Sequence, residues 1–104
     1  MKFLVLTRRK DAFLLVPQEQ RMAIWEGTVA FMKKYQRAGK CKEMYMEADL
    51  QRSASIWETD TEVEATKFIL ENPMSPFMDI EIRPVIGWDV AVKAQKAYFK
   101  KQAK

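Results

Sequence analysis

Carboxylates, a phenol and a guanidinium are the groups that could do chemistry in this sequence of 104 residues, because it contains no histidine. The lack of histidine excludes a Ser-His-Asp or Cys-His nucleophile pair and a histidine-ligated metal site. Glu43, Tyr45, Glu81 and Arg83 alternate with apolar residues in two short segments. Such groups can take a proton next to a carbonyl, stabilise the enolate and hold a carboxylate. Glu81 and Glu43 are therefore candidates for a base, and Tyr45 is a candidate hydrogen-bond donor.

Substrate binding is predicted for Arg83, Trp57 and Ser55, which alternate with apolar residues in the same way. A large apolar neighbour such as Trp57 raises the pKa of a carboxylic acid, as a base at neutral pH requires. A second interpretation stays open, in which the glutamates only pair with Arg83 and the aromatic rings only fill space. No cofactor is expected, and no metal, because Asp79 and Glu81 alone are a weak ligand pair.

The composition is that of one globular domain, with 48% hydrophobic and 31% charged residues, 3 glycines and 4 prolines. The single cysteine, Cys41, forms no internal disulfide, and no apolar run is long enough for a signal peptide or a membrane span. These features predict a cytoplasmic protein without a membrane partner.

The excess of positive over negative charge comes from the C-terminal residues. The formal net charge is +4, yet residues 1–92 carry 13 basic and 14 acidic groups, and the last twelve residues contain five lysines and no acid. A tail with lysine and no arginine is a poor reader of bases. We expect these lysines to form a solvated helix face, and we expect no nucleic-acid partner.

Hydrophobic periodicity gives the order strand, helix, strand, strand, helix, strand, followed by a last helix. Gly39 is expected at a left-handed helix end, and Thr61 with Glu64 has the spacing of a capping box. The expected ranges are strands 2–9, 41–47, 51–59 and 79–83, and helices 17–38, 61–72 and 89–101. This order predicts an α+β, ferredoxin-like βαββαβ subunit with a four-stranded antiparallel sheet over residues 1–88. The lysine-rich helix, 89–104, is expected to belong to the same domain.

Alternation along the strands predicts one sheet face packed on the helices and one bare face. The residues expected to face the helices are Leu4, Leu6, Met44, Met46, Ala54, Ile56, Ile80 and Ile82. The residues expected on the bare face are Phe3, Val5, Thr7, Glu43, Tyr45, Glu47, Ser53, Ser55, Trp57, Asp79, Glu81 and Arg83. That second set is too aromatic for solvent and too charged for a dry core. We therefore expect a homodimer, or a higher homo-oligomer, in which two bare faces close a barrel.

Two segments resemble the muconolactone isomerase family of the dimeric α/β barrel superfamily. They are Gln36-Arg37-Ala38-Gly39 and, above all, NPMSPFMDIEI from Asn72 to Ile82, preceded by SIWETDTEVEA. The resemblance covers about residues 36–82. It implies a dimeric α/β barrel, a ligand cleft and no metal or organic cofactor. The basic, tryptophan-rich second strand of the isomerases is replaced here by CKEMYME, from Cys41 to Glu47.

The resemblance implies a cofactor-independent isomerase that moves a proton on a small unsaturated lactone or a related organic acid. The alternative is a non-catalytic protein of the same barrel type that binds a small organic ligand or serves assembly. A cofactor-free monooxygenase using Trp57 and Tyr45 is a third possibility, without a specific signal in its favour.

Overall fold

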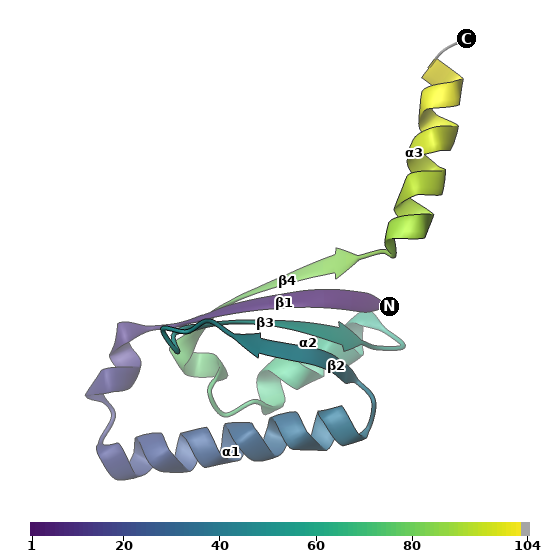
Figure 1. The fold of residues 1–104 in the computed structure, drawn as a ribbon. Coiled ribbons are helices and arrows are strands. Elements are labelled where there is room, and N and C mark those ends of the chain that lie inside the picture. The colour runs from purple at the N-terminus through teal and green to yellow at the C-terminus, as the bar shows by residue number, and fades with distance from the viewer. Residues whose placement is uncertain (103–104) are drawn as a thin grey trace.

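The computed structural model describes residues 1–102, which form a four-stranded antiparallel sheet with α1 and α2 on one side and α3 projecting away (Figure 1). The strand order is β2-β3-β1-β4, so β1 and β3 are central. The predicted ferredoxin-like order is confirmed. The elements are β1 Lys2–Arg9, η1 Asp11–Leu15, α1 Gln18–Arg37, β2 Cys41–Met46, β3 Arg52–Glu58, α2 Glu62–Glu71, η2 Ser75–Phe77, β4 Met78–Val85 and α3 Trp88–Gln102.

Two predicted helix boundaries are confirmed in their atomic detail. Gly39 follows α1 with φ of 74°, a conformation that glycine adopts without steric cost. At the start of α2, the hydroxyl of Thr61 accepts a hydrogen bond from the backbone N–H of Glu64 at 3.2 Å. The Glu64 carboxylate reaches back and accepts from the N–H of Asp60 at 3.0 Å. The capping pair therefore satisfies amide groups that the helix itself leaves open.

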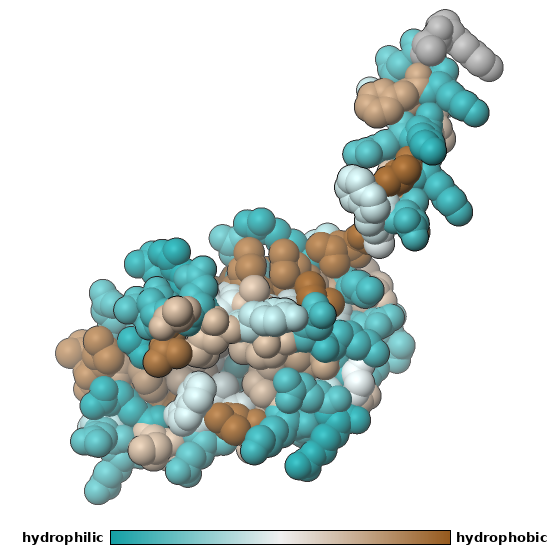
Figure 2. All heavy atoms as spheres, in the orientation of Figure 1, coloured by the Kyte–Doolittle hydropathy of each residue, from teal (hydrophilic) through white to brown (hydrophobic). Residues whose placement is uncertain are grey.

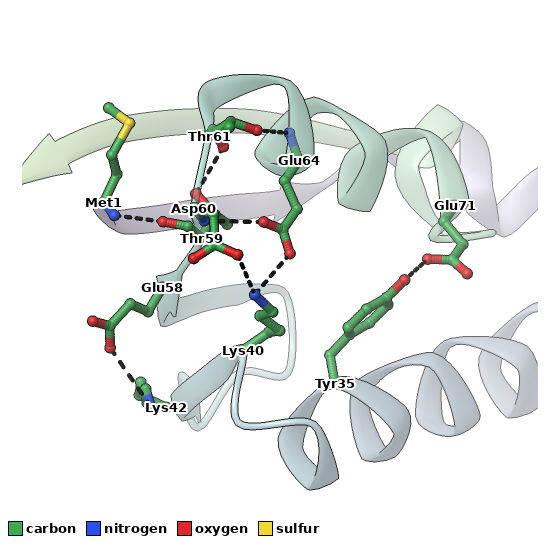
Figure 3. Close-up of polar contacts among 10 residues, drawn as sticks. All are labelled: Met1, Tyr35, Lys40, Lys42, Glu58, Thr59, Asp60, Thr61, Glu64 and Glu71. Carbon is green, nitrogen blue, oxygen red and sulfur yellow. Dashed lines mark hydrogen bonds and ion pairs between the residues drawn. The ribbon is translucent and has the colours of Figure 1, made fainter.

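A group of polar contacts joins this end of α2 to the neighbouring strands (Figure 3). The ammonium of Lys40 lies 3.0 Å from a carboxylate oxygen of Glu64 and 3.5 Å from one of Asp60. The hydrogen bond from the Asp60 N–H, with that from Lys40, lowers the pKa of Glu64. The N-terminal amine of Met1 donates to the carbonyl of Thr59. The start of the chain, the end of β3 and the start of α2 are thus held together.

A second polar contact joins the two helices. Tyr35 of α1 donates its hydroxyl proton to the carboxylate of Glu71 in α2, and the ammonium of Lys34 lies 2.8 Å from the same carboxylate (Figure 3 shows the Tyr35 contact). The hydrogen bonds from Lys34 and Tyr35 lower the pKa of Glu71, while the bond to Glu71 raises the pKa of Tyr35. Glu71 therefore stays ionised over a wider pH range than a free glutamate.

Beneath these contacts, an aromatic cluster fills one end of the space between sheet and helices. Trp57 is 5% exposed, and its ring centroid lies 6.0 Å from that of Phe31 and 4.9 Å from that of Phe68. Tyr35 packs at the side of the same group, with its ring centroid 4.4 Å from that of Phe68 and the two rings tilted by 54°. Aromatic pairs at these distances stabilise a core beyond their area alone.

The face prediction is wrong for the two central strands. The register aligns Phe3 with Trp57, and Thr7 with Ser53, and these residues face the helices. The opposite, open face carries Leu4, Leu6, Ala54 and Ile56, which were expected in the core. Both faces of β1 are apolar, so alternation alone does not tell which one meets the helices; the bulkier set, with Phe3 and Trp57, does. The edge-strand residues expected to face the helices, Met44, Met46, Ile80 and Ile82, do so.

Each edge strand of the sheet carries one irregular feature. Pro84 lies within β4, an edge strand, as its missing amide proton predicts. On the other edge, the register of β2 against β3 shifts between Cys41 and Glu43, which is a β-bulge.

The helix α3 leaves the sheet after Ile86 and Gly87 and runs away from the other elements (Figure 1). None of its residues is buried. The molecule is therefore 64 Å long, and its radius of gyration of 17.3 Å exceeds the roughly 13 Å of a compact chain of this size. The last residue of the predicted lysine tail, Lys104, lies outside the described residues. Across residues 1–102, no helix combines the length and apolar character that crossing a bilayer needs.

Candidate functional site

A cavity of about 420 Å³ lies between the sheet and the layer formed by α1 and α2. Its walls are almost entirely apolar, with side chains from β1, β3 and β4 on one side and from both helices on the other. The apolar residues that line the cavity include Val5, Val29, Met32, Ile80 and Ile82. This volume falls in the range of pockets that hold small organic molecules.

Three hydroxyl groups stand on the sheet wall of the cavity. Thr7 and Ser53 are paired across β1 and β3, and their hydroxyls share one hydrogen bond. Ser55 accepts a hydrogen bond from the indole N–H of Trp57 at 2.8 Å. Because a hydroxyl can donate as well as accept, Ser55 retains a proton to donate, and so does the accepting member of the Thr7–Ser53 pair. The sheet wall therefore presents hydrogen-bond donors in an otherwise apolar surface.

Asn72, at the end of α2, supplies a polar group from the helix side. Its side-chain oxygen accepts from the hydroxyl of Thr28 at 3.2 Å and from the backbone N–H of Met74 at 3.0 Å. These bonds fix the amide group, and its NH₂ makes no hydrogen bond to another residue of the 1–102 region. Asn72 thus adds a donor to the cavity, fixed in orientation by its own oxygen.

Arg9 is one of the two arginines among the lining residues, with Arg52, and it lies where β1 meets η1. It lies on the same face of β1 as Phe3, Val5 and Thr7. Its guanidinium carbon lies 5.9 Å from the ring centroid of Phe13. It forms no ion pair within the described part of the chain. A half-buried guanidinium without a carboxylate partner is suited to bind an anionic oxygen of a ligand.

The residues predicted from sequence to form one site lie on the two opposite faces of the sheet. Trp57 and Ser55 line the cavity. Glu81 and Arg83 lie on the open face, where their side chains form an ion pair with each other and both are exposed. Tyr45 is 64% exposed and shares the open face with Glu43. Their cross-strand partners in β3 are Ala54 and Ile56.

The open-face residues are also far apart from one another. Glu43 and Tyr45 belong to β2, whereas Glu81 and Arg83 belong to β4, at the other edge of the sheet. Three strand spacings of about 4.8 Å separate these edges by roughly 14 Å. A single small substrate therefore cannot contact both pairs within one subunit.

The cavity itself contains no acid. Across residues 1–102, no aspartate or glutamate is among its lining residues, and no three cysteine, aspartate or glutamate side chains lie close enough to hold a metal ion. Cys41 is buried in the core cluster with Trp57 and Phe68, and burial raises the pKa of its thiol, which makes it a poor nucleophile. The cavity is thus built to bind acceptor groups and to donate hydrogen bonds to them.

Sequence reasoning did not select Thr7, Ser53, Asn72 or Arg9 as site residues. Thr7 and Ser53 were placed with Ser55 and Trp57 on one face, which is confirmed, but that face meets the helices. Asn72 carried a sequence signal only as part of the Asn-Pro turn after α2. The fixed amide of Asn72 becomes visible only when α1 and α2 are packed side by side.

Comparison with known proteins gives one family and one fold. The family model described as "Muconolactone delta-isomerase" matches residues 1–89. No curated protein matches the chain. Among solved structures, a 5-chloro-2-hydroxyhydroquinone dehydrochlorinase from Burkholderia phenoliruptrix, in complex with 2,5-dihydroxybenzoquinone, superposes with a TM-score of 0.67. The two sequences are 15% identical over 86% of this chain and 97% of the other, so this likeness concerns the fold.

Proposed function

Because the chain belongs to the muconolactone delta-isomerase family, we propose that it binds a small ring compound carrying carbonyl or carboxylate oxygens in the cavity between sheet and helices. The observation that carries the proposal is the chemistry of the lining. Apolar walls accept the ring, while Ser55, the Thr7–Ser53 pair and Asn72 offer donors and no carboxylate competes for them. A lactone, a quinone or an aromatic acid has acceptors that match these donors.

Arg9 gives this ligand its preferred charge. Its side chain lines the cavity and is not neutralised by an acid in residues 1–102. A hydrogen bond from a charged donor is about twice as strong as one from a neutral donor. We therefore expect anionic ring compounds to bind more tightly than their neutral esters.

The test compares two adjacent arginines on opposite faces of the same strand. With 2,5-dihydroxybenzoquinone as probe, Arg9→Gln should weaken binding about tenfold, as the loss of one charged hydrogen bond does. Arg8→Gln removes the same charge from the open face and should leave the affinity unchanged. Isothermal titration of the full chain measures both. Equal affinities for the two variants and the wild type would contradict binding in the cavity.

A second candidate function is isomerase activity itself, a cofactor-independent proton transfer on a small unsaturated lactone. Membership of the family favours it, and Glu81, with Glu43 as second choice, is the proposed base. Since the cavity offers no carboxylate within the described residues, this reaction would take place on the open face beneath a second subunit. Tyr45 and Arg83 would then act from either subunit as donor and carboxylate ligand.

Glu81→Gln separates the two candidates. If Glu81 is the base, the substitution should lower the turnover of muconolactone by about 10² to 10⁴, while binding in the cavity persists. Arg8→Gln, on the neighbouring strand of the same face, is the control for a general effect of surface charge. Full turnover in Glu81→Gln would show that the Glu81–Arg83 ion pair is only structural.

The open face also supports the proposed homodimer. Leu4, Leu6, Ala54 and Ile56 form an apolar strip on it, and Tyr45 projects beside them. Figure 2 shows hydrophobic side chains gathered along the upper side of the body, on the side of the sheet away from α1 and α2. A contiguous apolar area on a sheet face without helices is typical of a surface that another subunit covers.

A further inference from the structure

The helix α3 carries an apolar stripe of which no residue is buried in its own subunit. At 100° per residue, Trp88, Val92, Tyr98 and Phe99 fall within one third of the helix circumference. Alanine and glutamine complete this stripe at positions 91, 95 and 102. Trp88 is 76% exposed and Phe99 is 65% exposed. Such a stripe is the pattern of a helix that packs on a surface.

The helix also lacks the means to be stable alone. It has 15 residues, and none of them is buried. Isolated helices of this length are marginal in water, because their stability in proteins comes from packing of one face. Figure 2 shows it standing clear of the body. A surface elsewhere must therefore cover the stripe.

The best match to this helix is the segment from Glu43 to Leu50, which contains the end of β2 and the turn that follows. It carries three acids and no base, whereas α3 carries four lysines and one acid. These charges of −3 and +3 are complementary. Within residues 1–102, the acids Glu43, Glu47 and Asp49 form no ion pair.

The same segment exposes apolar side chains. Tyr45 on the open face and Leu50 in the turn are among the exposed large hydrophobic residues of the body. Leu50 is 67% exposed and has φ of 62°, a left-handed conformation that glycine or asparagine adopts far more readily. Leu50 is also one of the residues that line the cavity, yet most of it stays exposed and open to a covering helix.

The two surfaces lie at opposite corners of the sheet. α3 follows β4, whose last residue, Val85, pairs with Lys2. The segment Glu43–Leu50 follows the other edge strand and turns at the opposite end, where Met46 pairs with Ser53. The helix, about 22 Å long, points away from that corner (Figure 1).

We propose that α3 of one copy of this chain packs against the segment Glu43–Leu50 of a second copy, and that the exchange is reciprocal. Burial of the aromatic rings of two such helices, at their present exposure, removes roughly 600 Å² of their surface from water. The surface that they cover contributes a similar area, which together approaches that of a stable dimer. The family match ends at residue 89, and the proposal does not depend on the ligand of the cavity.

A mixing experiment tests the contact directly. A full chain with Leu50→Cys is mixed with a full chain with Phe99→Cys and oxidised, and a covalent heterodimer is expected on a non-reducing gel. Lys93→Cys, on the opposite side of α3, replaces Phe99→Cys in the matched control and should give at least fivefold less product. The native Cys41 is buried, and wild-type chains oxidised alone measure its background.

Charge reversal tests the electrostatic match. Lys96 and Lys101 lie about 40° and 60° outside the edges of the apolar stripe, whereas Lys100 and Lys93 lie about 80° and 100° outside them. Sedimentation equilibrium should show at least tenfold weaker self-association for Lys96→Glu with Lys101→Glu, and little change for Lys93→Glu with Lys100→Glu. Adding Glu43→Lys and Glu47→Lys to the first variant should restore much of the association.

Three results would overturn the proposal. A disulfide that forms only within one chain carrying both cysteines would mean that α3 folds back on its own sheet. Equal cross-linking from positions 93 and 99 would mean that the helix has no preferred face. Equal weakening by the two lysine pairs would mean that only net charge matters.

Discussion

At the scale of single residues, a few side chains decide where α2 begins and how it is held. Thr61 accepts from the N–H of Glu64, and Glu64 accepts from Asp60 and from Lys40. Each contact satisfies a group at the helix N-terminus or places a negative charge near it, where the helix dipole favours it. Sequence spacing was enough to predict the Thr61–Glu64 pair, because it is local; the part played by Lys40 required the fold.

Thr61→Ala should lower the free energy of unfolding by about 1 kcal/mol, since it removes the cap of α2. Thr66→Ala is the matched control, because Thr66 lies inside the same helix and bonds only to the carbonyl of Glu62. Alanine favours a helix interior, so this variant should be as stable as the wild type or slightly more. Urea denaturation measures both, and equal losses would argue against the capping role.

At the scale of the elements, β1 and β3 show what the alternation of side chains along a strand can and cannot predict about the faces of a sheet. Alternation correctly grouped Thr7, Ser53, Ser55 and Trp57 on one face, but it placed that face on the side of the sheet away from the helices, where a second copy was expected. Leu4 and Leu6 are as apolar as Phe3 and Val5, so the central strand gave no polar side to orient it. In β4, where Ile80 and Ile82 alternate with charged residues, the prediction was right. The candidate site was therefore split because β1 is apolar on both faces and the helix-facing side of β3 carries two serines.

Trp57→Ala should lower the free energy of unfolding by about 3–5 kcal/mol, because the ring is buried between Phe31 and Phe68. Tyr45→Ala removes another large ring from the neighbouring strand, but an exposed one, and should change it by no more than about 0.5 kcal/mol. Chemical denaturation at low protein concentration measures both. A small effect of Trp57→Ala would show that the aromatic cluster is not a core.

At the scale of the whole molecule, polar contacts connect α1 and its C-terminal end to α2. Lys40 joins the end of α1 to α2 through Glu64, and Glu71 joins the two helices through Lys34 and Tyr35. The pKa of Glu64 is lowered first by the Asp60 N–H and then by Lys40, and that of Glu71 first by Lys34 and then by Tyr35. Both acids are thus more readily ionised in the folded chain than in the unfolded one.

Stability should therefore fall in acid. The contribution of these two glutamates is complete above the pKa of an unfolded glutamate, about 4.3, and is lost as the pH drops through their lower folded pKa values. Urea midpoints measured from pH 7 to pH 3 should decrease below about pH 4.3. Glu71→Gln should flatten this decrease, whereas Glu62→Gln should not, because Glu62 forms no ion pair in residues 1–102. Identical profiles would contradict the assignment.

The irregular features of the two edge strands affect how copies of this chain can meet. A regular edge strand offers free amide and carbonyl groups, on which another sheet can extend without limit. Here Pro84 removes one amide from β4, and the bulge between Cys41 and Glu43 disturbs the row of β2. Each edge therefore offers a shorter regular stretch on which a continuous ribbon could grow. The open face and α3 are the larger surfaces for association, and a contact between two identical faces closes on itself, which favours finite assemblies over fibres.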